Sequence, residues 1–88
     1  MLPSDHERRV VPALPDLPLS VLTRRECEVA LLIAAGLSNK QIAVRLAITA
    51  GTAGNHVGHI MRVLGATNRS QVAVWASERD RVGDRCRP

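Results

Sequence analysis

The fold is decided by residues 38–52, which read SNKQIAVRLAITAGT. Ser38 is suited to cap a helix, and Gln41, three residues later, can complete a capping box. The apolar residues that follow recur at the spacing of one helical face: Ile42, Ala43 and Leu46. Thr49 can cap a second helix after a joint of about three residues, the length typical of a helix-turn-helix.

A helix-turn-helix holds its second helix as a rigid element that can enter the major groove of DNA. On a helical wheel of residues 50–64, one side collects the apolar residues Ala53, Val57, Ile60 and Leu64 and is expected to be buried. The opposite side is expected to face outward; it holds Gly51, Asn55, Gly58 and Arg62, flanked by Gly54 and His59.

Cap and stop signals predict an all-α domain of four helices, over about 24–35, 39–46, 50–64 and 69–79. A Thr23–Glu26 capping box precedes the first helix, and Asn68, with Gln71 at the box position, precedes the fourth. We divide the chain into a proline-rich leader or linker (1–18), the helical domain (19–79) and a polar tail (80–88), which we expect to be frayed. No strand pattern and no repeat is present in the sequence.

Composition favours one small domain with an acidic partner. Trp75 is the one aromatic residue in 88, so the core must be aliphatic. The formal net charge is +4. Residues 19–77 hold six basic and two acidic residues, and 6 − 2 = +4, so the excess lies within the helical segment. An excess placed there favours a polyanion such as nucleic acid.

The cysteines and the N-terminus bear on the cellular setting. Cys27 and Cys86 are isolated and form neither a disulfide framework nor a zinc spacing, so we expect reduced thiols in the cytoplasm and interpret Cys27 as a small hydrophobe. Charged residues occupy the N-terminus where a signal peptide would be apolar. No apolar run approaches the roughly 20 residues that span a bilayer, so no membrane partner is expected.

The sequence contains three blocks, LTRRECEV (22–29), AGLSNKQIA (35–43) and LGATNRSQ (64–71), together with Gly51-Thr52, His56-Val57 and Ile60-Met61. With these motifs it resembles the LuxR-type (GerE-type) DNA-binding domain over about residues 19–77. The resemblance implies a bacterial transcription regulator whose third helix enters the major groove and whose fourth commonly supports dimerisation. Such a domain usually ends a response regulator or ligand-sensing protein, so a sensor or receiver domain in a longer parent is an implied partner. Region 4 of sigma factors shares the LTxRE opening, but the 64–71 joint and the helix after it favour the LuxR type.

Candidate DNA contacts come from the wheel and from the resemblance. Asn55 is best suited to read a base, because an amide can pair with adenine through two bonds. Ser38, Asn39 and Thr49 lie at helix starts, whose free N–H groups attract anions, although capping explains Ser38 and Thr49 equally well. Gly54 and Gly58 stand where the family often carries a side chain that reaches DNA. The full predicted set is Lys40, Thr49, Thr52, Gly54, Asn55, His56, Gly58, His59, Arg62 and Arg69, of which Lys40, Thr52 and Arg69 match backbone-gripping positions of the family.

The sequence therefore predicts sequence-specific binding of double-stranded DNA by a homodimer, with Val74, Trp75 and Glu78 as candidate dimer contacts. The alternative is a protein-interaction or dimerisation module on the same scaffold, with weak or non-specific DNA binding. No nucleophile has a base at a useful spacing, so we expect no enzyme, no catalytic residue and no cofactor. His56 and His59 alone would make a weak metal site, so no metal is expected either.

Overall fold

The computed structural model describes residues 14–88, which form a short 3-10 helix and four α-helices and, in that part of the chain, no strand. The elements are η1 (Leu19–Val21), α2 (Arg24–Ala34), α3 (Asn39–Leu46), α4 (Ala50–Leu64) and α5 (Arg69–Arg81). The predicted all-α class is confirmed. Both helices of the helix-turn-helix, α3 and α4, begin and end where the sequence predicts. Helix α2 ends one residue before its predicted end, and α5 ends two residues after its predicted end.

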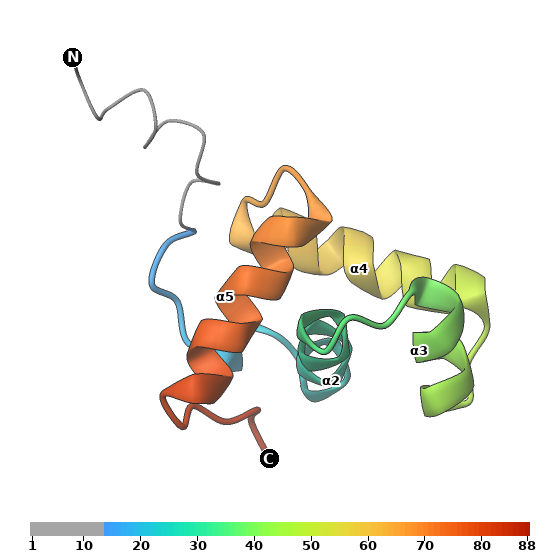
Figure 1. Ribbon diagram of the computed structural model, residues 1–88, viewed down its shortest axis with the longest axis horizontal. Coiled ribbons are helices and arrows are strands. Elements are labelled where there is room, and N and C mark those ends of the chain that lie inside the picture. The colour runs from blue at the N-terminus through green and yellow to red at the C-terminus, as the bar shows by residue number, and fades with distance from the viewer. Residues whose placement is uncertain (1–13) are drawn as a thin grey trace.

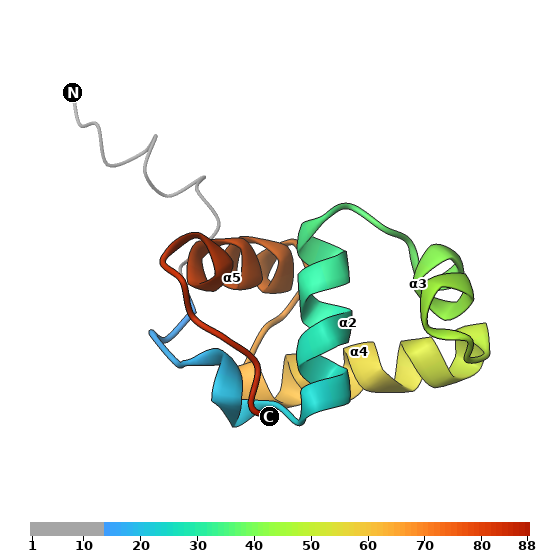
Figure 2. The ribbon, with the colours of Figure 1, turned by 90° about the horizontal axis from the view of Figure 1, so that it is seen from below.

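Helix α2 is the centre of the domain (Figure 1). It packs against α5 and α4, while α3 packs mainly on α4. Seen from below, α2 lies between α5 and α3, and α4 crosses it (Figure 2). The helix-turn-helix pair α3–α4 is therefore held to the rest of the domain mainly through α4.

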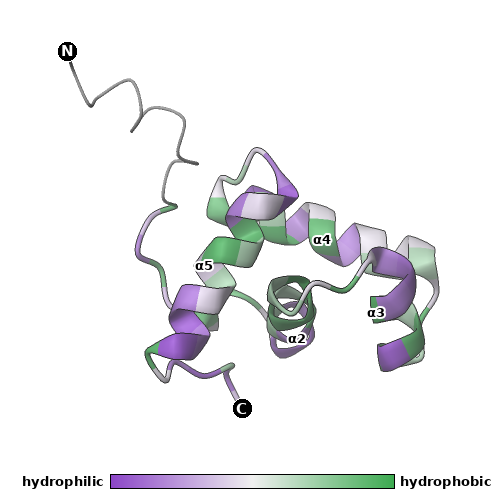
Figure 3. Cartoon of the chain, in the orientation of Figure 1, coloured by the Kyte–Doolittle hydropathy of each residue, from purple (hydrophilic) through white to green (hydrophobic). Residues whose placement is uncertain are grey.

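The core is aliphatic, as the composition predicts. Its largest fully buried side chains come from every helical element and are Leu19, Leu22, Val29, Ile42, Ile60 and Val72. Each such side chain contributes about 1.5–3 kcal/mol when it leaves water. Hydrophobic residues colour most of α2 and the middle of α5, whereas the C-terminal end of α5 and the start of α3 are hydrophilic (Figure 3).

The predicted caps set the helix starts. Thr23 and Glu26 form a complete capping box before α2, and Ser38 and Gln41 form one before α3. Before α5 the arrangement differs from the prediction. Asn68 caps Gln71 N–H as expected, but Gln71 Oε1 accepts from Thr67 N–H at 2.6 Å, one residue earlier than a capping box requires.

The turn between α3 and α4 depends on a left-handed residue. Ala47 has φ 60° and ψ 44°, and within residues 14–88 it alone among non-glycine residues has a positive φ. Ile48 N–H then donates to Ala43 O at 3.0 Å, which closes the end of α3 and brings the chain into α4. A left-handed alanine costs roughly 1–2 kcal/mol, so the packing on both sides imposes this turn.

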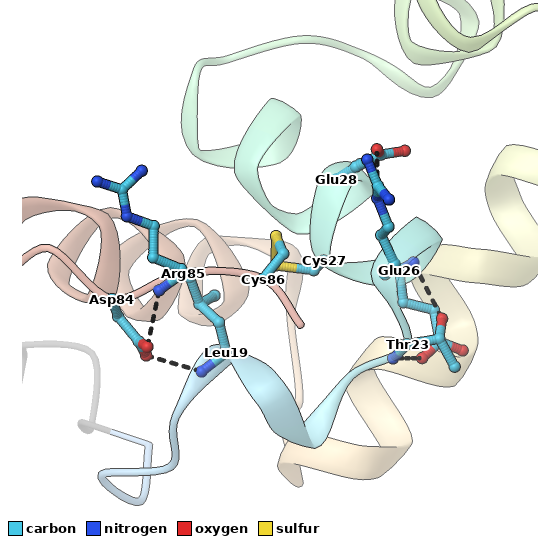
Figure 4. Close-up of a disulfide and its surroundings, with 9 residues drawn as sticks. Leu19, Thr23, Glu26, Cys27, Glu28, Asp84, Arg85 and Cys86 are labelled. Atoms are coloured by element: carbon cyan, nitrogen blue, oxygen red, sulfur yellow. Dashed lines mark hydrogen bonds and ion pairs between the residues drawn. A yellow bond between two sulfur atoms is a disulfide. The ribbon is translucent and has the colours of Figure 1, made fainter. Parts of the chain in front are cut away.

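The cysteines and the tail differ from the sequence-based expectation. Cys27 is fully buried as predicted, yet its sulfur forms a disulfide with Cys86, so the expectation of unpaired thiols is wrong (Figure 4). The tail is not frayed: Asp84 Oδ2 accepts from Leu19 N–H at 2.8 Å, and the Arg87 guanidinium donates to Ser20 O. Polar composition predicted fraying because it does not report contacts made with residues some 60 positions away.

The described end of the leader also packs on the domain. Leu14 and Leu17 lie against the core, and Trp75 Nε1 donates to Leu17 O at 3.0 Å. Asp16 pairs with Arg79 of α5 at 2.7 Å. The leader prediction for residues 1–13 falls outside the described residues. None of the helices within residues 14–88 has the length and apolar character required to cross a bilayer.

Candidate nucleic-acid interface

Helix α4 presents the two faces that the wheel predicts. Ala53, Val57, Ile60 and Leu64 are buried. Gly51, Asn55 and Arg62 are exposed, and Gly54 and Gly58 are half-buried. The apolar stripe fixes the rotation of α4 about its own axis, because turning it would expose these side chains to water. The outward face is thereby left available to a ligand.

The glycines of this face are not required by the fold. A Cβ added to Gly51 would lie 3.8 Å from Thr49 Oγ1, and one added to Gly58 would lie 3.9 Å from Arg62 Nη1. A Cβ on Gly54 would lie 3.7 Å from Asn39 Nδ2. All three separations are ordinary van der Waals distances. A Cβ would therefore fit at each position, so the packing around α4 does not require glycine there.

Two threonines, Thr49 and Thr52, stabilise the start of α4. Thr49 Oγ1 accepts from Thr52 N–H at 3.0 Å and donates to Thr52 Oγ1 at 2.9 Å. Both residues are exposed, as is Lys40 on the first turn of α3. Capping thus occupies part of the hydrogen-bonding capacity of Thr49, while the Lys40 ammonium lies at the surface of the helix-turn-helix.

His59 is turned toward α2. Its Nδ1 contacts Glu26 Oε2, while Glu26 Oε1 accepts from Thr23 N–H at 3.0 Å. Burial alone would raise the pKa of Glu26, but the hydrogen bond from Thr23 and the contact with His59 outweigh it and hold that pKa below its ordinary value. One carboxylate therefore caps α2 and ties it to α4. His59 and Glu26 lie 33 residues apart in the sequence, so no local sequence pattern predicts their contact.

His56 is half-buried. Within residues 14–88 no three or more His, Cys, Asp and Glu side chains gather closely enough to hold a metal ion.

Arg69 is anchored inside the domain. Its Nη1 donates to Asn39 Oδ1 at 2.6 Å and its Nη2 donates to Leu37 O at 2.7 Å. This pair of bonds joins the first residue of α5 to the first residue of α3 and to Leu37, just before that helix. The sequence predicts a phosphate contact for Arg69, and it does not show these bonds to Asn39 and Leu37.

The candidate dimer residues on α5 divide into two kinds. Val74 is 54% exposed, and Glu78 is exposed and paired with Arg81. Trp75 is only 5% exposed, because the leader and the core cover it. As the chain is folded, Val74 and Glu78 are exposed, whereas Trp75 is buried and donates to the leader.

Comparison with known families agrees with the order of these elements. The model of the family described as bacterial regulatory proteins, luxR family, matches residues 20–76. The chain belongs to this family. The match runs from η1 into α5, so it includes the whole helix-turn-helix.

Curated relatives are similar over the same segment. DegU, a transcriptional regulatory protein of Brevibacillus brevis, is 44% identical over 57 residues, which are 65% of this chain and 24% of DegU. The nitrate/nitrite response regulator protein NarL of Escherichia coli (strain K12) is 39% identical over 66 residues, 75% of this chain and 31% of NarL. DevR/DosR of Mycobacterium tuberculosis, a DNA-binding transcriptional activator, is 43% identical over 61 residues, 69% of this chain and 28% of that protein. The chain thus spans less than a third of the length of each.

Proposed function

We propose that this chain binds double-stranded DNA as the DNA-binding part of a bacterial transcription regulator, with α4 in the major groove. The observation that carries the proposal is the outward face of α4, which the fold holds rigidly in a helix-turn-helix and leaves uncovered. Membership of the luxR family supports it, as does the +4 charge excess within residues 19–77.

The residues divide by task. Asn55 is exposed on the outward face and offers both a donor and an acceptor, which is what reading adenine requires. Arg62 and His56 flank it along α4. Lys40 supplies a positive charge from α3, and Thr49 and Thr52 supply hydroxyl and N–H groups at the start of α4. Most of the affinity would come from phosphate neutralisation and would fall steeply with salt.

The working form is proposed to be a homodimer joined through α5, around Val74 and Glu78. Two copies related by a two-fold axis would place their α4 helices in half-sites about one helical turn apart, or a multiple of it. We further propose that the chain acts in the cytoplasm, where the DNA that it is proposed to bind lies. We also propose that a sensor or receiver domain controls it, because the response-regulator relatives are longer than this chain.

A second candidate is a protein-interaction module on the same scaffold. Gly54 and Gly58 favour it, because each removes a side chain that would otherwise reach the groove. Such a module would bind DNA weakly and without preference for sequence.

The test is selection from a random-sequence duplex pool at about 100 mM salt, where the screening length is about 10 Å. Enrichment of a two-fold symmetric motif is the expected result. On the selected duplex, Asn55→Ala should relax preference at one base pair by about 1–3 kcal/mol. Lys40→Ala should weaken binding to all sequences and lower the salt slope by about one.

Arg85→Ala is the matched control, since it removes the same charge from the tail, on the side of the domain away from α3 (Figure 1). Binding without enrichment would favour the interaction module. No binding at all would contradict the proposed function.

A further inference from the structure

We propose that the side-chain amide of Asn39, held in place by Arg69, donates a hydrogen bond to DNA. The amide lies beside Gly54 and takes the place of the side chain that α4 lacks at that position. The inference rests on the proposed DNA binding and deepens it. It assigns Arg69 the role of a positioning residue, which acts through Asn39.

The orientation of the Asn39 amide follows from its partner. A guanidinium has donors and no acceptor, so the group that faces Arg69 Nη1 at 2.6 Å must be the carbonyl Oδ1 of Asn39. The second bond, from Arg69 Nη2 to Leu37 O at 2.7 Å, fixes the guanidinium plane. Asn39 therefore cannot exchange its oxygen and nitrogen without losing a charge-assisted bond. Its Nδ2 has to point away from Arg69.

That direction leads to α4. The Cβ that Gly54 lacks would stand 3.7 Å from Asn39 Nδ2, so the amide nitrogen lies against the glycine. Within residues 14–88 no buried side-chain nitrogen or oxygen lacks a hydrogen-bond partner. Nδ2 has no hydrogen bond to a described residue, so it is not among the fully buried atoms, and Asn39 as a whole is half-buried beside Gly54. A longer side chain at residue 54 would extend over it.

The chemistry of the amide limits what it can bind. With Oδ1 turned toward Arg69, the group that Asn39 presents beside Gly54 is the Nδ2 donor, whereas two-bond pairing with adenine needs the donor and the acceptor side by side. It can donate to a phosphate oxygen or to a base acceptor such as guanine N7. We favour the phosphate, because Lys40, the next residue, is exposed and adds a positive charge at the same end of α3.

The decisive variant is Asn39→Asp in the full chain. Aspartate keeps an oxygen for Arg69, so the internal anchor stays, but it replaces the outward Nδ2 donor with an acceptor that repels phosphate. We expect Kd for a labelled duplex of mixed sequence to rise more than about tenfold, with a thermal midpoint that is not lowered, because the carboxylate lies at the start of α3 and still pairs with Arg69. Asn39→Ala should raise Kd about tenfold and leave the salt slope unchanged, because a neutral donor releases no counterion.

The role of Arg69 is tested by a double-mutant cycle. If Arg69 acts through Asn39, Arg69→Met should weaken binding about as much as Asn39→Ala, and the double variant should be no weaker. Additive losses, with a salt slope lowered by about one in Arg69→Met, would mean that Arg69 contacts phosphate itself and would overturn the positioning role.

The outcomes separate the inference from the proposed function. Equal losses for the neutral Asn39→Ala variant on all duplexes identify a phosphate contact, while relaxed preference at one guanine or thymine identifies a base contact. Wild-type affinity in Asn39→Asp, while Lys40→Ala still binds more weakly, would overturn the inference and leave DNA binding intact. A wild-type chain that binds no duplex would overturn both.

Discussion

The disulfide between Cys27 and Cys86 sets the largest single stability effect that the structure predicts. It joins α2 to the C-terminal tail across a sequence separation of 59 residues. In the chain-entropy model, closing a loop of this length removes about 4 kcal/mol of conformational freedom from the unfolded state at 25 °C. A small domain is stable by about 5–15 kcal/mol, so the bond supplies a large share of the total.

The perturbation is Cys86→Ser. Cys86 lies at the partly exposed end of the bond, so its replacement opens no cavity, whereas Cys27 is fully buried. We expect the free energy of unfolding to fall by about 4 kcal/mol, which lowers the thermal midpoint by about 15–30 °C in a domain of this size. Urea denaturation followed by circular dichroism measures the free energy directly.

Dithiothreitol supplies the internal control. It should bring the wild-type chain to the stability of Cys86→Ser and leave that variant unchanged. The denaturant slope should also rise on reduction, because the cross-linked unfolded chain exposes less surface. The reasoning is refuted if non-reducing mass spectrometry shows the bond intact and its reduction shifts the free energy by less than about 1 kcal/mol.

Three further effects concern single side chains. Because the pKa of Glu26 is lowered, the ionised Glu26 stabilises the fold above about pH 4.5, and this stabilisation is lost as the pH falls through the folded-state pKa. The thermal midpoint of Glu26→Gln should therefore fall less on acidification than that of the wild type. Ala47→Gly should raise the free energy of unfolding in urea by up to about 1 kcal/mol, since glycine accepts a left-handed backbone without a steric penalty. Gly58→Ala should raise it by about 1 kcal/mol through helix propensity, and an unchanged or lower value in calorimetry would contradict the free space found there.

The helices were predictable because their signals are local. The two residues of each capping box, Thr23–Glu26 and Ser38–Gln41, are three positions apart, and the apolar stripe of α4 repeats at helical spacing. Such signals depend on side chains that meet through the geometry of one helical turn. Their effect survives in any compact fold, which is why the bounds of α3 and α4 agree to the residue.

Most of the features that were missed join distant parts of the chain. The Cys27–Cys86 bond and the contact of Asp84 with Leu19 close loops that no periodicity marks. The candidate site shows the same division. The exposure of Asn55 followed from the wheel, whereas the engagement of Arg69 with Asn39 and of His59 with Glu26 depends on how α5 and α2 meet the helix-turn-helix.

The residues on the outward face of α4 contribute little to the stability of the helix, which depends on contacts made elsewhere along α4. Gly51, Gly54 and Gly58 each weaken a helix by about 1 kcal/mol relative to alanine. The Thr49 cap, the buried stripe and the Glu26–His59 contact offset that cost from outside the face. A helix stabilised in this way keeps its shape while presenting few side chains, so a duplex could approach its backbone closely. Discrimination would then depend on Asn55 and Arg62, the polar side chains of this face, while the oriented amide of Asn39 would add affinity through a phosphate.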